Sequence, residues 1–391
     1  MKTKQLLLCL TIPVVLAACS GGDGNGAGPG TITAAEGPQS MPLRFGAQVT
    51  FGDSLSDVGS YAVGAIGAAG GGKFTINGDR TQQYPELVGR IWNEMLAAQF
   101  GLPAPCAAQT GLQGDPLQGL SAPVVDHPGC FNYAQGGARV VEPVGPGNRL
   151  AGSPIGQLTL PVAAQVANHL ATIGGRFQGN ELVFVMAGAN DIVVQWGELS
   201  RGAAAAAQAA GPAGAAEARA AYLAAYGPAA IAAAGAAANG LVAIVLQQIV
   251  AAGANYVVVN NVPDLAGTPL GGIQEPQLRA LVQAMLEEFN RVLKAGLDPE
   301  AKVAQVDIYS LFRDALANPL PYGLSNTRAP ACGPNALQGH SLMCTVWNTY
   351  PVDVSHFMFA DTVHPTPYGH WLMARVVQQV MSQKGWATPL W

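Results

Sequence analysis

Short apolar runs that alternate with helical segments constrain the fold of this 391-residue chain most strongly. Residues 182–186 are continuously apolar, as a strand buried on both faces of a sheet should be. Similar β-prone runs predict further strands at 48–51, 254–260 and 302–307. Amphipathic or apolar segments predict helices at 85–100, 241–252 and 275–295. This alternation predicts a parallel sheet that is covered by helices on both faces.

The chain carries few charges, and this limits the partners it can have. Only 11% of its residues are Asp, Glu, Lys or Arg, compared with about 25% in a typical soluble domain. The net charge is −5 and Lys and Arg form no block, which argues against nucleic acid as a main partner. Hydrophobic residues make up 49%, enough for a large core. No run of about 18 purely apolar residues follows the N-terminus, which argues against several membrane spans.

The N-terminus has the pattern of an export signal. Two lysines precede an apolar stretch in residues 1–18, as in a secretory signal peptide. The sequence from Leu16 to Cys19 resembles the bacterial lipobox, which implies a diacylglyceryl anchor on Cys19. Residues 19–44 would then form a Gly-rich tether and 45–391 the folded domain. We expect an exported protein on the bacterial cell envelope, at the outer membrane or cell surface, or released from it.

Four cysteines remain beyond the signal and the lipobox: Cys106, Cys130, Cys332 and Cys344. An exported chain meets an oxidising environment, where disulfides are expected. Four cysteines allow three connectivities. We favour Cys106–Cys130 and Cys332–Cys344, because each pair brackets a Pro/Gly-rich loop. Zinc is the competing interpretation, but no CxxC spacing supports it, and we expect no metal.

Residues 201–240 are unusually rich in alanine, which fills 23 of the 40 positions. Alanine is the strongest helix former, so one or two helices are expected, with breaks near Gly211-Pro212 and Gly227-Pro228. Two interpretations stay open at this point. The segment is either an inert helical insertion, which we favour, or a mobile cap over a lipid-binding cleft. Residues 101–128 are Pro/Gly-rich and predict a long loop.

Two short segments suggest a nucleophile and its base. Ser54 follows the first predicted strand within Gly-Asp-Ser-Leu, and a strand-to-helix turn exposes a hydroxyl beside backbone N–H groups. Asp361 and His364 are three residues apart in a turn, where the carboxylate can orient the imidazole toward one serine. The Gly-x-Ser-x-Gly elbow occurs nowhere in the chain, which argues against the α/β-hydrolase fold.

Two middle segments suggest hydrogen-bond donors for an oxyanion. The Gly136-Gly137 pair offers backbone N–H groups that a substrate oxygen can approach. Asn190 follows directly on the apolar run 182–186, so its side-chain amide should lie at the end of that strand. These segments lower the chance that Asp361 and His364 are only a surface turn.

The order of these four motifs resembles the SGNH (GDSL) hydrolases, within them the bacterial branch of secreted lipases, phospholipases and acyltransferases. The resemblance extends over about residues 45–384. It implies a three-layer αβα sandwich with a parallel, flavodoxin-like sheet, and it implies no metal or organic cofactor. It assigns these roles: Ser54 as nucleophile and first oxyanion donor, Gly137 and Asn190 as further donors, His364 as base and Asp361 as its orienting group. Ser60 stands where this branch often has Asn, and the alanine-rich insertion is longer than usual.

The expected function is therefore hydrolysis of carboxylic esters, of acyl lipids or small acyl esters, by a monomer. Three alternatives remain. A lipid acyltransferase or a carbohydrate deacetylase would use the same residues. A non-catalytic surface-binding lipoprotein belongs to another class, against which the intact set of site residues argues.

Overall fold

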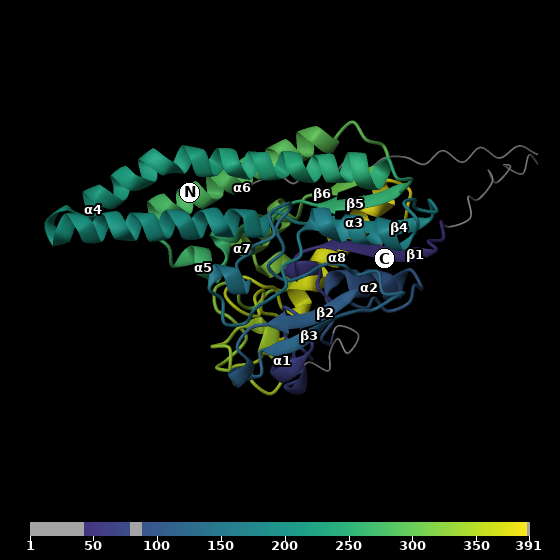
Figure 1. Cartoon of the computed structure of the whole chain (residues 1–391), viewed down its shortest axis with the longest axis horizontal. Helices are drawn as coiled ribbons and strands as arrows, with labels where there is room; N and C mark the ends of the chain where they lie inside the picture. The colour runs from purple at the N-terminus through teal and green to yellow at the C-terminus, as the bar shows by residue number, and fades with distance from the viewer. Residues whose placement is uncertain (1–42, 79–87, 389–391) are drawn as a thin grey trace, which may run out of the picture. The chain divides into compact units, whose positions relative to one another are not determined.

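A parallel sheet forms the centre of the domain, as the sequence predicted. The computed structural model describes residues 43–78 and 88–388. Four strands pair in parallel in the order in which they occur in the chain, as Figure 1 shows: β1 (Ala47–Gly52), β4 (Glu181–Met186), β5 (Tyr256–Asn260) and β6 (Val303–Val306). All four predicted strands are confirmed. The carboxyl ends of these strands therefore meet at one edge of the sheet.

A short extended segment continues the sheet beyond β1. The Thr50 N–H donates to the Phe131 carbonyl at 2.9 Å, and the Tyr133 N–H donates to the Thr50 carbonyl at 2.8 Å. The resulting bridge between Thr50 and Asn132 is parallel. This segment occupies the place of the second strand in the flavodoxin-like order, with β1 between it and β4.

Helices cover both faces of the sheet. Val183 and Val185 of β4 belong to the core on one face, whereas Leu182 and Phe184 belong to the core on the other. The first face packs against α3 (Val162–Thr172), α4 (Ala189–Ala243) and α6 (Pro276–Leu297). The second packs against α2 (Trp92–Gln99), α7 (Ile308–Ala317) and α8 (Pro367–Gln383). The fold is a three-layer αβα sandwich, as expected.

The alanine-rich segment forms a long helical hairpin. Helix α4 leaves the sheet, turns back at Gly211 (φ 69°, ψ 176°) and returns, as the two teal arms in Figure 1 show. The predicted break at Gly211 is confirmed, but the one at Gly227-Pro228 is wrong, because the helix continues through Pro228. By length and composition alone, Ala189–Val250 could cross a membrane, and 39% of its most apolar window is buried in the domain.

The returning arm of the hairpin packs along α6 and runs parallel to it. On the side nearer the turn at Gly211, Arg219 forms an ion pair with Glu275, and Gln277 donates to the Ala220 carbonyl at 3.3 Å. Further along, Gly227 lies against Leu281 so closely that a Cβ atom would come within 2.6 Å of that side chain. Small residues on this arm therefore allow the two helices to approach each other.

Three other expectations need correction. Residues 101–128 contain an antiparallel hairpin of β2 (Gln109–Gln113) and β3 (Ser121–Asp126), not only a loop. The buried side chain of Leu112 anchors β2. The helix expected at 85–100 begins at Trp92, and residues 85–87 lie outside the described part. The helix expected at 241–252 is the end of α4 and the π-helix η5 (Ile244–Val250). The remaining short helices are α1 (Gly64–Ala68), α5 (Pro269–Gly272), η1 (Ser54–Ser56), η3 (Pro116–Gln118), η4 (Arg149–Ala151), η6 (Leu265–Gly267), η7 (Leu320–Tyr322) and η8 (Ser341–Met343).

Both expected disulfides are present. Cys106 is bonded to Cys130 across a separation of 24 residues, and Cys332 is bonded to Cys344 across 12. The first ties the entry and exit of the β2–β3 hairpin together. The second closes a loop that precedes Asp361 in the chain. Each cross-link restricts the unfolded chain as well as the native one.

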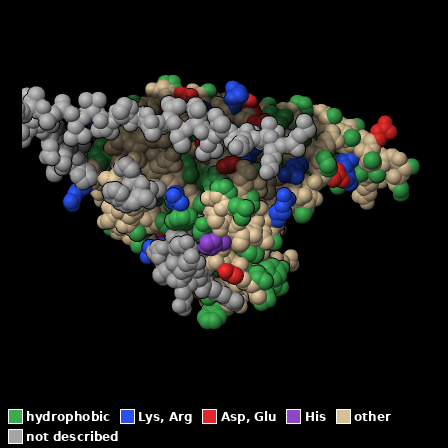
Figure 2. All heavy atoms as spheres, turned by 180° about the vertical axis from the view of Figure 1, so that it is seen from behind, with side chains coloured by type: hydrophobic (Ala, Val, Ile, Leu, Met, Phe, Trp, Pro, Cys, Tyr) green, Lys and Arg blue, Asp and Glu red, His purple; other side chains and the backbone are tan. Residues whose placement is uncertain are grey.

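The surface has few charged side chains on the face drawn in Figure 2. Its described Lys and Arg side chains lie scattered among apolar and uncharged polar atoms, with no continuous basic patch. The predicted signal, Cys19 and the predicted tether up to residue 42 lie outside the described residues.

Candidate active site

Ser54 lies where β1 ends and the short helix η1 begins. Asp53 caps that helix, because its Oδ1 accepts the Leu55 N–H at 3.1 Å. The backbone just before it is also fixed: Gln165 accepts the Gly52 N–H and donates to the Gly52 carbonyl, both at 2.8 Å. Ser54 is 9% exposed, so its position is held on all sides while its hydroxyl remains reachable.

The structure brings Ser54, His364 and Asp361 into one hydrogen-bonded chain. His364 Nε2 is 2.9 Å from Ser54 Oγ, although the two residues are 310 positions apart. His364 Nδ1 is 2.8 Å from Asp361 Oδ2 and 3.0 Å from Oδ1. A carboxylate only accepts hydrogen bonds, so Nδ1 carries the proton and Nε2 is free to accept the serine proton. The three hydrogen-bonded side chains are therefore arranged for proton transfer from Ser54 to His364.

The Asp361 carboxylate is kept charged by its surroundings. It is buried, and burial alone would favour the neutral form. The neighbouring His364, and after it His340 and the Ser341 hydroxyl, outweigh that effect and hold the pKa of Asp361 well below its ordinary value. Three backbone N–H donors also bind the carboxylate. The donors are the N–H groups of Val363, His364 and Ser341, at 2.8–2.9 Å. A charged carboxylate in this place can stabilise an imidazolium.

The two predicted oxyanion donors lie at the same edge of the sheet as Ser54. The segment that contains Gly137 runs past the end of β1, where the Gln135 N–H donates to the Gly52 carbonyl at 3.1 Å. Gly137 has φ of +80°, and a Cβ atom there would meet Thr159 at 2.7 Å, so the position requires glycine. Asn190 is the second residue of α4, which follows β4, and its amide donates to the Ala138 carbonyl at 2.9 Å, which uses one of its two hydrogens.

Asp57 is a site residue to which the motif comparison gave no role. It is fully buried, and one carboxylate oxygen accepts the Gly59 and Ser60 N–H groups at 2.9 and 2.7 Å. The other accepts the Gly136 N–H at 2.9 Å. Asp57 therefore connects the turn after the nucleophile to the Gly136-Gly137 pair. Gln165 was also missed, since nothing in the sequence of α3 marks a polar residue that binds Gly52.

Two carboxyl groups near Ser54 titrate abnormally. Burial raises the pKa of Asp53 to about 7 and that of Asp57 to about 6, although backbone N–H donors partly oppose the shift. Burial also raises the pKa of Asp191, which follows Asn190. Its Oδ1 forms an ion pair with Arg139 Nε at 3.1 Å. The site therefore combines one firmly charged carboxylate, Asp361, with two carboxyl groups, Asp53 and Asp57, whose pKa values burial raises toward neutral pH.

The other histidines that could suggest a metal site do not form a cluster of ligands. His340 lies 5.8 Å from the His364 ring, His356 stacks on Tyr368, and His370 is buried on α8. Within residues 43–78 and 88–388, no group of three or more His, Cys, Asp or Glu side chains could hold a metal ion.

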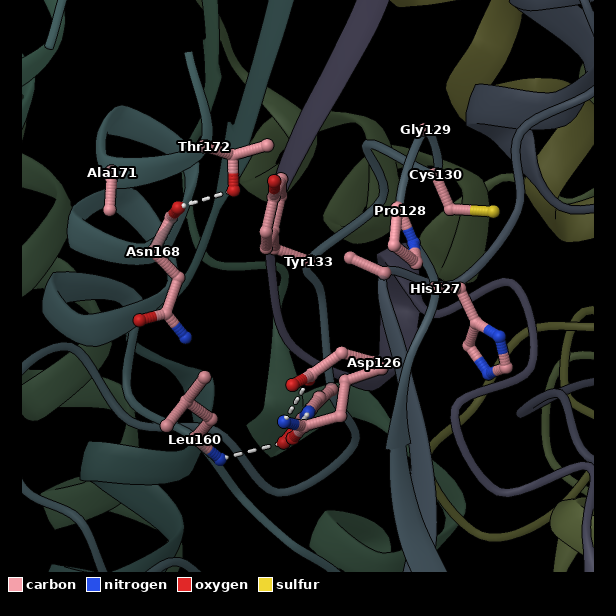
Figure 3. A pocket seen from close by; sticks show the side chains of 13 residues that line it. Asp126, His127, Pro128, Gly129, Cys130, Tyr133, Leu160, Asn168, Ala171 and Thr172 are labelled. Carbon is pink, nitrogen blue, oxygen red and sulfur yellow. Dashed lines mark hydrogen bonds between the residues drawn. The ribbon is translucent and has the colours of Figure 1, made fainter. Parts of the chain in front are cut away.

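A cavity of about 350 Å³ lies away from this chain of residues. It is lined by Asp126 and His127 of the β3 end, by Tyr133, and by Asn168 and Thr172 of α3, as Figure 3 shows. In that view Asn168 and Thr172 lie on one side of Tyr133, and His127 lies on the other. Neither Ser54 nor His364 lines it. We therefore assign it no part in the site.

An αβα sandwich with a Ser–His–Asp chain at the carboxyl edge of its sheet defines a class of serine hydrolase-like proteins. The sequence matches the family described as GDSL-like Lipase/Acylhydrolase over residues 49–377. The chain therefore belongs to this family. The four motifs identified from the sequence all fall within the matched region.

Similarity to individual proteins is distant. A protein of Pseudomonas putida, "Uncharacterized protein in trpE-trpG intergenic region", is 26% identical over 87% of this chain and 49% of its own length. The Arabidopsis thaliana "GDSL esterase/lipase At2g31550" is 25% identical over 31% of this chain and 36% of its own. The chain thus spans half or less of these relatives. Among solved structures, phospholipase A1 from Streptomyces albidoflavus is similar, with 14% sequence identity and a TM-score of 0.45. The alignment covers 87% of this chain and 99% of the phospholipase chain.

Proposed function

We propose that this protein hydrolyses carboxylic esters through an acyl-enzyme on Ser54. The hydrogen-bonded chain from Ser54 through His364 to Asp361 carries the proposal. Each member of the chain has the partner that its role requires, and the distances fall within hydrogen-bonding range. Membership of the GDSL-like lipase/acylhydrolase family supports the same class of reaction.

The reaction begins when Ser54 Oγ attacks the ester carbonyl carbon and His364 Nε2 takes the hydroxyl proton. The carbonyl π electrons move onto oxygen, and Asp361 stabilises the imidazolium. Collapse of the tetrahedral intermediate breaks the bond to the alcohol, which leaves with the proton from His364. Water then attacks the acyl-Ser54 ester, and His364 takes its proton. The second tetrahedral intermediate collapses with loss of the bond to Ser54 Oγ, which receives the proton from His364, and the carboxylic acid leaves.

The developing oxyanion is stabilised by three donors in this proposal. They are the N–H of Ser54, the N–H of Gly137 and the second amide hydrogen of Asn190. Among the described residues, neither backbone N–H is hydrogen-bonded to another protein group, so both are free to meet a substrate oxygen. Loss of one such donor costs roughly 10²–10³ in kcat in comparable enzymes.

Replacement of the nucleophile tests the proposal directly. Ser54→Ala should lower kcat on p-nitrophenyl esters by several orders of magnitude, because no acyl-enzyme can form. The wild type should also be labelled covalently by a fluorophosphonate, and the variant should not. If Ser54→Ala kept wild-type turnover or labelling, the assignment of Ser54 would be wrong. If the wild type showed neither, the alternative of a non-catalytic lipoprotein would replace this proposal.

The proposed substrates are acyl lipids or small, uncharged acyl esters. The scarcity of charged side chains in the chain supports this class. Activity should be measured across p-nitrophenyl esters of increasing acyl length. A sharp preference for acetyl esters on sugars would indicate a carbohydrate deacetylase instead. Product analysis with a lipid donor and an added acceptor alcohol would reveal an acyltransferase.

We also propose that the protein is exported and anchored through lipidated Cys19. The lysines and apolar stretch of residues 1–18, the lipobox-like sequence and the two disulfides support this location. Expression with radiolabelled fatty acid should label the wild type and leave Cys19→Ser unlabelled. Equal labelling of both would contradict the anchor.

A further inference from the structure

Ser341 presents two polar groups to the Asp361–His364 pair. It is the first residue of η8 and is fully buried. Its N–H donates to Asp361 Oδ2 at 2.9 Å. Its hydroxyl oxygen lies 3.3 Å from His364 Nδ1 and also contributes to stabilising the Asp361 charge. No other residue outside the 361–364 turn hydrogen-bonds, within the described chain, to both members of the pair.

The turn that contains Ser341 is fixed on one side by residues 72–77. The Gly72 N–H donates to the Leu342 carbonyl at 3.0 Å, and the Asn77 N–H donates to the Cys344 carbonyl at 2.8 Å. The Asn77 amide donates again, to the carbonyls of Ser341 and Cys344 at 3.2 and 2.9 Å. These bonds meet the carbonyls of the turn, so its backbone has little freedom to shift.

The other side is fixed covalently. Cys344, three residues after Ser341, is bonded to Cys332. The Cys332 N–H donates to the Ala360 carbonyl at 2.8 Å, and the Ala360 N–H donates to the His364 carbonyl at 2.7 Å. The disulfide therefore joins the turn of Ser341 to the backbone on which Asp361 and His364 lie.

We infer that Ser341 is a positioning residue for the Asp361–His364 pair and that the Cys332–Cys344 disulfide keeps it in place. The inference rests on the proposed serine-esterase function of the same site. The Ser341 N–H donates to Oδ2, whereas the N–H groups of the 361–364 turn donate to Oδ1, and the hydroxyl limits rotation of the imidazole. A base that turns away from Ser54 accepts its proton less readily, and small displacements of reacting groups cost large factors in rate.

The hydroxyl is tested by Ser341→Ala, with Ser341→Thr as the conservative variant. Ser341→Ala should lower kcat on p-nitrophenyl butyrate about tenfold and leave KM close to wild type, because substrate binding is not changed. The rate of fluorophosphonate labelling should fall by a similar factor. Ser341→Thr retains the hydroxyl and should recover most of the lost kcat. Thermal unfolding of each variant sets an assay temperature at which it is folded.

The disulfide is tested by a double-mutant cycle. In a background of Cys332→Ser with Cys344→Ser, kcat should already be reduced, and adding Ser341→Ala should lower it by much less than tenfold, because the hydroxyl is no longer held in place. The matched control is Cys106→Ser with Cys130→Ser, which removes the other disulfide. In that background, Ser341→Ala should keep its full effect.

The outcomes separate this inference from the proposed function. If the wild type is active and Ser54→Ala is inactive, but Ser341→Ala has wild-type kcat, the inference is overturned and the function stands. A raised KM with unchanged kcat, or equal effects of Ser341→Ala in both disulfide backgrounds, would also overturn it. If the Cys332/Cys344 variant does not fold, the comparison of Ser341→Ala with Ser341→Thr still decides the role of the hydroxyl.

Discussion

At the scale of single residues, Asp57 binds the backbone next to Gly137, a proposed oxyanion donor. Its two oxygens accept three N–H groups from two segments far apart in the chain. An amide in its place would turn one acceptor into a donor that faces either the Gly136 N–H or those of Gly59 and Ser60. A shift of the Gly136 backbone caused by this mismatch should also move Gly137, which follows Gly136 in the chain.

Asp57→Asn should therefore lower kcat by roughly ten- to a hundredfold, less than or equal to the loss of a donor itself. Steady-state kinetics on p-nitrophenyl esters provide the measurement. Asp126→Asn, at an exposed carboxylate on β3, is the matched control and should keep wild-type kcat. Wild-type turnover in Asp57→Asn would show that Gly137 keeps its place without this carboxylate.

Burial of His370 makes stability depend on pH. Burial lowers the pKa of this imidazole to about 3, whereas in the unfolded chain it titrates near 6.5. As the pH falls below about 6.5, only the unfolded state takes up the proton, so the free energy of unfolding falls by about 1.4 kcal/mol per pH unit. The loss continues until the folded state is protonated near pH 3.

In His370→Gln this loss is absent. Between pH 7 and pH 5, the wild type should lose about 2 kcal/mol more of unfolding free energy than the variant does. Urea denaturation at the two pH values measures the difference. If the free energy of unfolding changed equally with pH in the wild type and in His370→Gln, the role of His370 would be contradicted.

At the scale of elements, the hairpin α4 is attached along its length rather than hinged. Its returning arm contacts α6 near Arg219, at Gly227 and at Gly235, where a Cβ atom would meet Glu288 at 3.0 Å. Leu241 at the end of the arm is fully buried in the core. This packing favours the interpretation of a structural insertion over that of a mobile cap.

Gly227→Leu should force α4 away from α6 and destabilise the domain by about 1–3 kcal/mol, because the new side chain has no space beside Leu281. Denaturant unfolding measures this change. Gly197→Ala on the outgoing arm is the control, since its Cβ would meet only the flexible end of Arg201. If Gly227→Leu is as stable as the wild type but loses activity on long-chain esters only, the hairpin acts on the substrate instead.

The elements also show what sequence could and could not predict. The strands were found because continuous apolar runs such as 182–186 are buried on both faces. The β2–β3 hairpin was missed because β3 is largely exposed and interrupted by Pro123, so it has no such run. Pro228 predicted a break that the packing of the returning arm against α6 overrides. Local signals therefore failed where tertiary contacts decide the backbone.

At the scale of the whole molecule, the motifs located Ser54, Asp361 and His364, because their order in the chain is informative. They could not locate Ser341, Gln165 or the role of Asp57. These three act through hydrogen bonds to groups that are distant in sequence, and such partners leave no pattern of spacing. The supporting shell of a site is a property of the assembled fold.

The separation of 310 residues between the proposed nucleophile and its proposed base has a consequence for synthesis. A ribosome makes Ser54 310 residues before His364, which comes shortly before α8. A chain that is interrupted anywhere between them holds a serine without its base. Under the proposed mechanism, activity therefore requires translation at least as far as His364.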